Sequence, residues 1–523
     1  MEARHLRAAA AVLSAASVGI ALVAFRSRLL SSKDPRVERR AAIDVGSGST
    51  KMVVADVDVK SYRIIREVHS EERPISFSLE SKAHPQELLS ERTMAAGLSV
   101  LAEFAATAKV LGCNGAVAAV ATEVFRKAPN GPEYLEKVWT EVGIDVRLVS
   151  QAVEAELGFR TAAAYRSKDT ELESIVCWDA GGGSFQIARV DPTAKVQSPL
   201  PAAAAATPPP PPPPLNLLPP YLASFGSGVV CAQCLALFPK PLASPTETAN
   251  TTTTENTTAD TTNAAAAVRS ISPHPISWVE FEQLVNHIEA QLSDPPPSLL
   301  LLPSAASAAA VASKEEEEKV ASSRAGATAW PTAAAAADVP AGGAGEGALV
   351  LTAIGGENSM FRLVPDLLGL GFGLKAYPWS TSSGRSSNGS SSSGHMDSNG
   401  SGEKKGRRQR ELFGCADVKA AAALVVDKDD DALEAEFGPS KLGSETHLVA
   451  CKLALLLATL RRLESSRRSC HLLNTSSPFS TTASPVAPTP AMPALKVRYQ
   501  PCVGSCAGML THPAFTLRTS AHI

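Results

Sequence analysis

The feature that most constrains the fold is a repeated pattern of apolar strand, aspartate, glycine cluster and second apolar strand. It occurs first as AAIDVGSGSTKMVVADVD around Asp44 and recurs about 135 residues later as SIVCWDAGGGSFQIARVD around Asp179. Each copy predicts a β-hairpin, because a glycine cluster between two apolar runs cannot be the interior of a helix. Two similar hairpins predict a duplicated architecture.

Helical and strand-like segments alternate between and after the hairpins, so the expected class is α/β. Between the hairpins the expected elements are helices and strands at 90–111, 115–122, 132–142, 145–150 and 152–164. Beyond the second hairpin, apolar pieces that predict a second lobe occur at 221–238, 278–292, 348–364 and 445–463.

Stretches without periodic apolar positions separate the pieces of this second lobe. They are dominated by Ala, Pro, Ser, Thr, Gly or Glu and cover 201–214, 246–262, 295–347, 380–406 and 474–493. We expect long disordered insertions in surface loops, because such inserts lengthen connections at little cost in stability. The predicted organisation is a targeting or anchor segment at 1–40 and a first lobe at 41–191. An interrupted second lobe follows at 192–470, and a partly disordered tail at 471–523.

Residues 8–25 form a nearly unbroken apolar stretch with arginines on both sides. About 18 residues are barely enough to span a bilayer as a helix, and they suit a cleaved targeting segment about as well. We expect delivery to an organelle, either plastid or mitochondrion, or a membrane contact through 8–25. Whether this segment is cleaved, or is kept as a helix packed elsewhere, stays open.

Charge and cysteine content exclude some classes of partner. A formal net charge of -3 gives no electrostatic reason to expect nucleic-acid binding, and the short basic patch 404–410 lies in Ser/Gly-rich sequence. Nine cysteines in a chain of 523 residues do not make a disulfide framework, which favours a reducing compartment. Cys231 and Cys234 lack a second pair at metal spacing, so we interpret them as buried core thiols.

The two glycine turns are typical of phosphate binding. Glycines permit conformations in which several N–H groups point at one anion, and they leave no Cβ in the way. One such turn is also ordinary turn chemistry, so it is the recurrence that favours a phosphate site. Asp44 and Asp179 are expected to bind Mg²⁺ or another divalent cation. The expected substrate-binding residues are Gly46, Ser47, Gly48, Ser49, Thr50, Gly181, Gly182, Gly183 and Ser184, with Lys51 adding a positive charge.

Four motifs resemble the exopolyphosphatase and guanosine pentaphosphate phosphohydrolase family, a branch of the superfamily of sugar kinases, actin and heat-shock ATPases. They are AIDVGSGSTKM, ATEVFRKAPNG, VSQAVEAELGF and WDAGGGSFQ. The resemblance implies two ribonuclease H-like lobes around a phosphate-binding cleft. It implies a hydrolase that releases terminal orthophosphate from inorganic polyphosphate or guanosine pentaphosphate by metal-assisted attack of water. Glu154 matches the family's general base, and Arg126 stands where a guanidinium binds substrate oxygens; Glu156 is expected on another helix face.

The chain departs from better-known members of that family at two positions. Gln186 stands where they carry a carboxylate, and Gly48 where they commonly carry Asn. An amide can hold a bound water but supplies no charge to Mg²⁺. Two alternatives therefore stay open: a catalytically idle protein that binds polyphosphate or guanosine alarmones, and an ATP-dependent phosphotransferase favoured by the Gly355–Gly356 turn. The choice of substrate, and a monomer or a homodimer, stay open as well.

Overall fold

The computed structural model describes eleven stretches of the chain, namely 36–59, 63–113, 117–166, 170–192, 215–239, 272–300, 349–356, 358–370, 412–475, 494–502 and 505–512. The apolar stretch 8–25 and, apart from a few bordering residues, the expected low-complexity insertions lie outside them. Within the described stretches, no helix combines the length and the apolar character that crossing a membrane requires.

The first sheet is built on the first hairpin. Its strands are β1 (Val37–Val45), β2 (Ser49–Asp58), β3 (Arg63–Pro74), β4 (Val117–Ala121) and β5 (Val146–Leu148). Their order is β3-β2-β1-β4-β5, with β1 to β3 antiparallel and β4 and β5 parallel to β1. This is the ribonuclease H-like arrangement, in which an antiparallel meander is extended by two parallel strands.

The second sheet repeats that arrangement around the second hairpin. Its strands are β6 (Val176–Ala180), β7 (Phe185–Arg189), β8 (Tyr221–Ala223), β9 (Val350–Gly355) and β10 (Lys496–Pro501). From the meander outward the order is β8-β7-β6-β9-β10, again with an antiparallel meander and two parallel strands. The two orders are equivalent strand for strand, which confirms the duplicated α/β architecture.

The structure corrects the expected division of the chain. β6 and β7, which we expected in a first lobe ending at 191, belong to the second sheet. β10, which we expected in a partly disordered tail, completes that sheet beside β9. The boundary was placed too late because hairpins pair with strands that lie far away in the sequence. Each lobe therefore carries one glycine hairpin, rather than both hairpins sharing one lobe.

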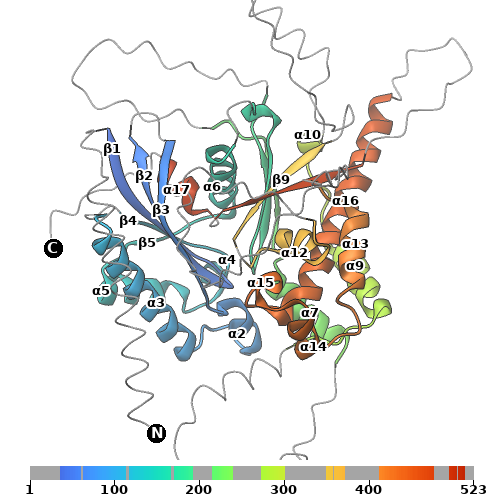
Figure 1. Ribbon diagram of the computed structural model, residues 1–523, viewed down its shortest axis with the longest axis horizontal. Coiled ribbons are helices and arrows are strands. Elements are labelled where there is room, and N and C mark those ends of the chain that lie inside the picture. The colour runs from blue at the N-terminus through green and yellow to red at the C-terminus, as the bar shows by residue number, and fades with distance from the viewer. Residues whose placement is uncertain are drawn as a thin grey trace, which may run out of the picture.

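The helices fall into three groups (Figure 1). The first lobe carries α2 (Phe77–Ala83), α3 (Glu91–Val110), α4 (Glu123–Lys127) and α5 (Gly131–Val142). Two helices, α6 (Gln151–Ala164) and α17 (Cys506–Thr511), share apolar clusters with both sheets and so lie between them.

The second lobe has a larger, mostly helical core. The helices are α7 (Ser227–Leu237), α9 (Trp278–Gln291), α10 (Pro297–Leu300), α12 (Met360–Leu367), α13 (Cys415–Ala423), α14 (Asp430–Phe437), α15 (Pro439–Leu442) and α16 (Val449–Thr475), with 3₁₀ turns at Leu172–Ser174 and Thr446–Leu448. One apolar cluster joins α16 to α7, α9 and the second sheet. The expected thiols Cys231 and Cys234 are buried within it.

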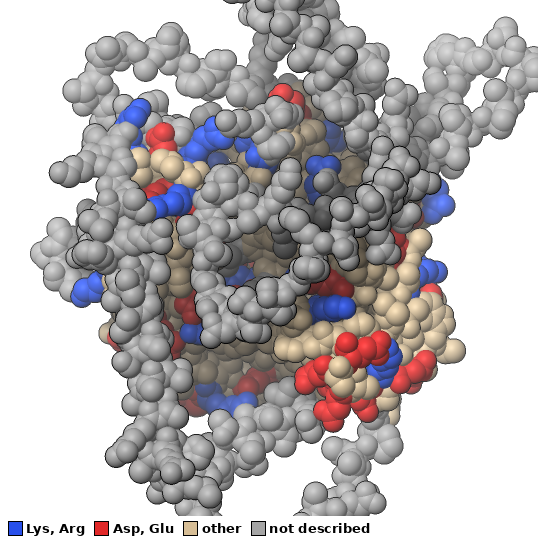
Figure 2. All heavy atoms as spheres, viewed as in Figure 1, with Lys and Arg blue, Asp and Glu red and all other residues tan. Residues whose placement is uncertain are grey.

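Local signals explain where several helices begin and end. The Ser90 side chain accepts the Thr93 N–H at the start of α3, and Ser277 and Glu280 form a capping box at the start of α9. Gly143 ends α5 in the left-handed conformation that glycine adopts without strain. On the face shown in Figure 2, acidic side chains gather over α14, where the sequence runs DDALEAEF.

Candidate active site

A cleft lies between the turns of the two glycine hairpins. Its volume is about 90 Å³. Residues from both lobes line it, including Asp44, Gly46, Ser47, Gly48, Ser49, Lys51, Glu72, Thr122, Glu154, Asp179, Gly181, Gly182, Gly183, Ser184, Gln186, Ser227, Gly355, Gly356, Asn358, Ser359, Glu445, Lys452 and Ser505. The structure thus brings both expected aspartates, Glu154 and nearly all of the expected loop residues to one place.

The two turns are closed by the same hydrogen bond. The Gly46 N–H donates to the Ser49 carbonyl at 3.0 Å, and the Gly181 N–H donates to the Ser184 carbonyl at 2.9 Å. These two amides stabilise the turns and are not free for a ligand. The duplication therefore extends from strand order down to individual backbone bonds.

In the first turn, the next two carbonyls point away from the cleft. The Ser47 carbonyl accepts the Ser78 N–H and the Gly48 carbonyl accepts the Ile75 N–H, both at 2.9 Å. A trans peptide holds its N–H opposite its carbonyl. The N–H groups of Gly48 and Ser49 consequently face the cleft, where they can donate to an anion.

The second turn is held in the same way by the start of α7. The Gly181 and Gly182 carbonyls accept the N–H groups of Ser227 and Gly228, at 3.3 Å and 2.9 Å. Gly228 does not line the cleft, so by the same argument the N–H group of Gly183 faces it. Backbone donors thus converge from opposite walls.

Glycines allow a close approach of the second turn to the first turn and to the start of α7. A Cβ on Gly182 would lie 3.1 Å from the Gly48 nitrogen, and a Cβ on Gly226 would lie 2.2 Å from the Gly182 carbonyl carbon. Real Cβ atoms do not approach backbone atoms at the shorter of these distances. The two phosphate-loop candidates therefore approach backbone to backbone at Gly48 and Gly182.

Asp44 and Asp179 lie at the floor of the cleft. Asp44 is buried, and its Oδ1 has no hydrogen-bond partner, while its Oδ2 accepts the Ser505 N–H at 3.4 Å. Burial raises the pKa of Asp44 above its ordinary value. Burial also raises the pKa of Asp179 to about 6, with Lys51 opposing and Asp44 adding to the rise.

These aspartates fit a divalent cation held partly by other ligands. An unpartnered, buried carboxylate oxygen is the kind of atom that a cation satisfies. Among the described residues, no group of three or more His, Cys, Asp and Glu is placed to hold a metal by itself. Mg²⁺ commonly uses one or two carboxylates together with water and substrate phosphates. The donor set present agrees with that mode.

Each aspartate faces a different side chain across its hairpin. Asp44 pairs with Lys51 in the β1–β2 ladder, and Asp179 pairs with Gln186 in the β6–β7 ladder. Burial alone would lower the pKa of Lys51, but Glu72, Asp44 and Asp179 together raise it above its ordinary value. Lys51 is therefore a charged ammonium inside the cleft.

Glu154 projects into the cleft from the first turn of α6, whose N-cap is Ser150. Its Oε1 accepts Arg126 Nη1 at 3.0 Å, and its Oε2 accepts Gln186 Nε2 at 3.0 Å. Burial raises the pKa of Glu154 to about 7 although Arg126 opposes the rise. A carboxylate with this pKa can take up and release a proton at neutral pH.

Three expectations are refined by the structure. Thr50 does not line the cleft and is fully buried, because β2 starts at Ser49 and successive side chains of a strand face opposite ways. Its contact with substrate therefore stays a prediction. Arg126 also does not line the cleft: its guanidinium donates to Glu154 and to the Val149 carbonyl, at 2.6 Å. Its direct contact with substrate stays a prediction. Glu156 pairs with Arg160 outside the cleft, as expected.

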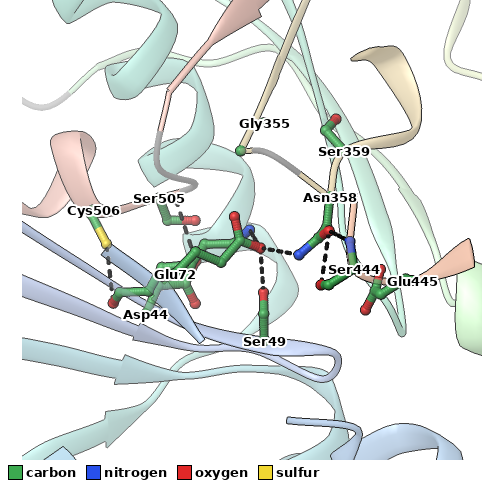
Figure 3. A network of polar contacts seen from close by, with 12 residues as sticks. Asp44, Ser49, Glu72, Gly355, Asn358, Ser359, Ser444, Glu445, Ser505 and Cys506 are labelled. Carbon is green, nitrogen blue, oxygen red and sulfur yellow. Dashed lines mark hydrogen bonds and ion pairs between the residues drawn. The ribbon is translucent and has the colours of Figure 1, made fainter. Parts of the chain in front are cut away.

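Sequence reasoning did not single out four lining side chains, Glu72, Glu445, Lys452 and Ser505. Lys452 Nζ donates to Glu445 Oε2 at 2.6 Å and to the Asn358 carbonyl at 2.7 Å. Figure 3 labels three of these four residues, Glu72, Glu445 and Ser505, which come from segments far apart in the sequence. No local motif marks them, because only the tertiary fold brings them together.

Comparisons with known proteins agree with the resemblance seen in the motifs. Residues 53–200 match the model of the Ppx/GppA phosphatase family. An uncharacterized protein of Streptomyces coelicolor is 30% identical over 150 residues, which are 29% of this chain and 42% of that protein. The chain thus matches less than half the length of this relative.

Similar solved structures include an exopolyphosphatase-like protein with 12% identity and a TM-score of 0.49, where 91% of this chain and 97% of that chain are covered. They also include the Ppx/GppA family member of Aquifex aeolicus, at 14% identity, 91% and 97% coverage and a TM-score of 0.43. An exopolyphosphatase of Cytophaga hutchinsonii is 13% identical with a TM-score of 0.45, and 90% of this chain and 96% of that chain are covered.

Identities of 12–14% and TM-scores below 0.5 are too low to establish the architecture. The architecture follows instead from the strand order of this chain. The similarity to the family is seen in the sequence match, which covers Glu154, Asp179 and the second glycine turn. As the motifs predicted, residues 53–200 are similar to the Ppx/GppA phosphatase family.

Proposed function

We propose that this protein is a phosphoanhydride hydrolase that releases terminal orthophosphate from inorganic polyphosphate or guanosine pentaphosphate. The observation that carries the proposal is Glu154, a carboxylate with a pKa of about 7 that lines the same cleft as both glycine turns. Hydrolysis of a phosphoanhydride needs an oriented water opposite the leaving oxygen, and a base to take its proton. Glu154 is placed for the second task.

The remaining groups divide the other tasks. The backbone N–H groups that face the cleft, with Ser47 and Ser184 beside them, would hold the terminal phosphate. Lys51 would offset part of its charge. Arg126 and Gln186 hold the Glu154 carboxylate from two sides, so its orientation toward an attacking water is set before substrate arrives.

Asp44 and Asp179 are the residues that would hold a divalent cation. When bound, such a cation would neutralise charge on the phosphoryl oxygens. The unpartnered Oδ1 of Asp44 supports this assignment.

Removal of the base is the direct test. Replacing Glu154 by Gln keeps the shape and removes proton acceptance, so orthophosphate release from polyphosphate or guanosine pentaphosphate with Mg²⁺ should fall roughly 10²- to 10⁴-fold. Glu156→Gln is the matched control, because Glu156 lies on the same helix but pairs with Arg160 and His512 outside the cleft. It should retain activity. Orthophosphate release at the wild-type rate by Glu154→Gln would contradict the assignment of Glu154 as the general base.

A second candidate is a protein that binds phosphate chains without cleaving them. It is favoured by Gln186, which gives the second hairpin an amide where a carboxylate would add charge for a metal. Binding of polyphosphate by the wild type without any orthophosphate release would favour this candidate. Acceptor-dependent consumption of ATP in the same assay would instead indicate a phosphotransferase.

A further inference from the structure

The carboxylate of Glu72 lies in the cleft although it comes from β3, outside both glycine turns. Its Oε1 accepts Ser49 Oγ at 2.8 Å and Asn358 Nδ2 at 3.4 Å, as Figure 3 shows. The same oxygen lies 4.0 Å from Lys51 Nζ. The side chain of Glu72 is only 10% exposed.

These partners are of the kind that a phosphate oxygen needs. Carboxylate and phosphate oxygens accept hydrogen bonds from the same hydroxyl, amide and ammonium donors. Ser49 and Lys51 belong to the first hairpin, whose turn amides face the cleft. Glu72 thus engages a hydroxyl and a cation beside the expected phosphate position.

The carboxylate of Glu72 is an anion at neutral pH. Burial would raise its pKa, but Lys51 and the hydrogen bonds from Ser49 and Asn358 lower it below its ordinary value. The cleft therefore already contains a negative charge bound to its own donors.

Glu72 also reaches the opposite lobe. A Cβ on Gly356 would lie 2.4 Å from Glu72 Oε2, so the carboxylate rests against the turn that follows β9. Asn358 is held in turn, because its Oδ1 accepts the Ser444 N–H at 3.0 Å. The carboxylate spans from the first sheet to the second lobe and has little room to share the position with a second anion.

We propose that Glu72 is a built-in competitor for phosphate: a phosphate group uses Ser49 Oγ and Lys51 only by displacing this carboxylate. The inference rests on the proposed function, since it takes phosphate as the ligand of the cleft. Displacement subtracts the same free energy from the binding of every ligand that uses these donors. Weakly held anions are thereby kept out of the site.

Neutralising Glu72 leaves Lys51 in place opposite Asp44 in the β1–β2 ladder. Glu72→Gln should therefore release both a hydroxyl and a cation for the ligand without removing either. A hydrogen bond to a charged group is worth enough that its release should tighten binding roughly tenfold or more.

The test is calorimetric titration of the full-length protein with inorganic tripolyphosphate and Mg²⁺. A Glu154→Gln background prevents consumption of the ligand. In this background Glu72→Gln should bind tripolyphosphate roughly tenfold or more tightly than the parent. Glu71→Gln is the matched control, because Glu71 lies next to Glu72 on β3 but pairs with His69 and Arg73. It should bind like the parent.

The outcomes separate this inference from the proposed function. Equal or weaker binding by Glu72→Gln, with the parent still binding, would overturn the role proposed for Glu72. It would leave phosphate as the ligand of the cleft. Absence of binding by parent, Glu71→Gln and Glu72→Gln alike would overturn both. Glu72→Asp guards against a folding defect, because it keeps the charge but shortens the side chain. Its affinity should fall between those of the parent and Glu72→Gln, and an affinity below the parent's would contradict the proposal.

Discussion

At the scale of residues, the chemistry of the cleft depends on which side chain stands opposite each aspartate. Gln186, opposite Asp179, donates Nε2 to Glu154 at 3.0 Å and to Ser184 Oγ at 3.1 Å. An ionised carboxylate at this position could accept hydrogen bonds but not donate them. The amide therefore stabilises the ionised form of Glu154, which is the form that accepts a proton.

This relation predicts a change in pH dependence. Because the pKa of Glu154 is about 7, kcat/KM should rise with pH through the neutral range as this base loses its proton. Gln186→Glu would put a like charge about 3 Å away in place of a donor, which favours the protonated form of Glu154. The acidic limb of the kcat/KM profile should then move to higher pH by roughly one unit or more.

The measurement is the pH profile of orthophosphate release at fixed Mg²⁺ for wild type and Gln186→Glu. A limb that stays in place would show that Gln186 does not act on Glu154.

At the scale of elements, the contact between α17 and α6 sets part of the site. The Gly508 N–H donates to Thr161 Oγ1 at 2.8 Å, and a Cβ on Gly508 would lie 2.1 Å from the Leu157 carbonyl oxygen. The two helices therefore meet with backbone against backbone. This close docking holds Ser505, at the start of α17, beside Asp44.

Gly508→Ala should therefore destabilise the protein although alanine is the better helix former. The extra methyl group cannot fit against Leu157 without moving α17, and such overpacking costs about 1–3 kcal/mol. Urea unfolding of wild type and variant measures the difference. An unfolding free energy equal to or above that of wild type would contradict the docking described here.

The elements that could be predicted from sequence are those whose signals are local. Both hairpins, α3, α5, α6 and α9 follow from glycine turns and from apolar periodicity. β3 was missed because it reads RIIREVHSEERP, a half-buried edge strand whose sequence has few apolar positions to alternate. β10 and α17 were missed because their partners, such as β9 for β10 and β1 for α17, lie far earlier in the chain.

The same contrast explains the site. The aspartates and turn residues could be predicted, because one motif carries them. Glu154 was found through the resemblance to a family rather than from its local sequence, where it resembles any helical glutamate. Glu72 and Ser505 had no such signal, since their roles depend on tertiary contacts alone.

At the scale of the whole molecule, the last described segment ties the two lobes together. β10 pairs with β9 in the second sheet, and α17, a few residues later, packs on β1, β2 and α6. Leu510 is buried there, and its carbonyl accepts Arg40 Nη1 at 3.5 Å. A short stretch near the end of the chain thus contributes to both cores.

Truncation should therefore disturb both lobes. A chain ending at Thr475 lacks β10 and α17, so β9 becomes an edge strand and the apolar faces of α6 and β1 lose their cover. We expect loss of the sharp thermal transition and rapid cleavage in limited proteolysis. A chain ending at His512 keeps every described contact and is the control. Equal protease resistance of both truncated chains would refute the interpretation.

The pairing of Asp44 with Lys51 and of Asp179 with Gln186 has a consequence for how such a protein diverges. The two turns are closed by equivalent backbone hydrogen bonds, so the proposed oxyanion site would draw on the same backbone feature in both halves. The residue facing each aspartate differs between the halves, although both turns keep the same closing hydrogen bond. In an ancestral repeat with two identical halves, substitutions at this single equivalent position could therefore separate the roles proposed for Lys51 and Gln186. These roles are charge compensation in one half and orientation of a base in the other.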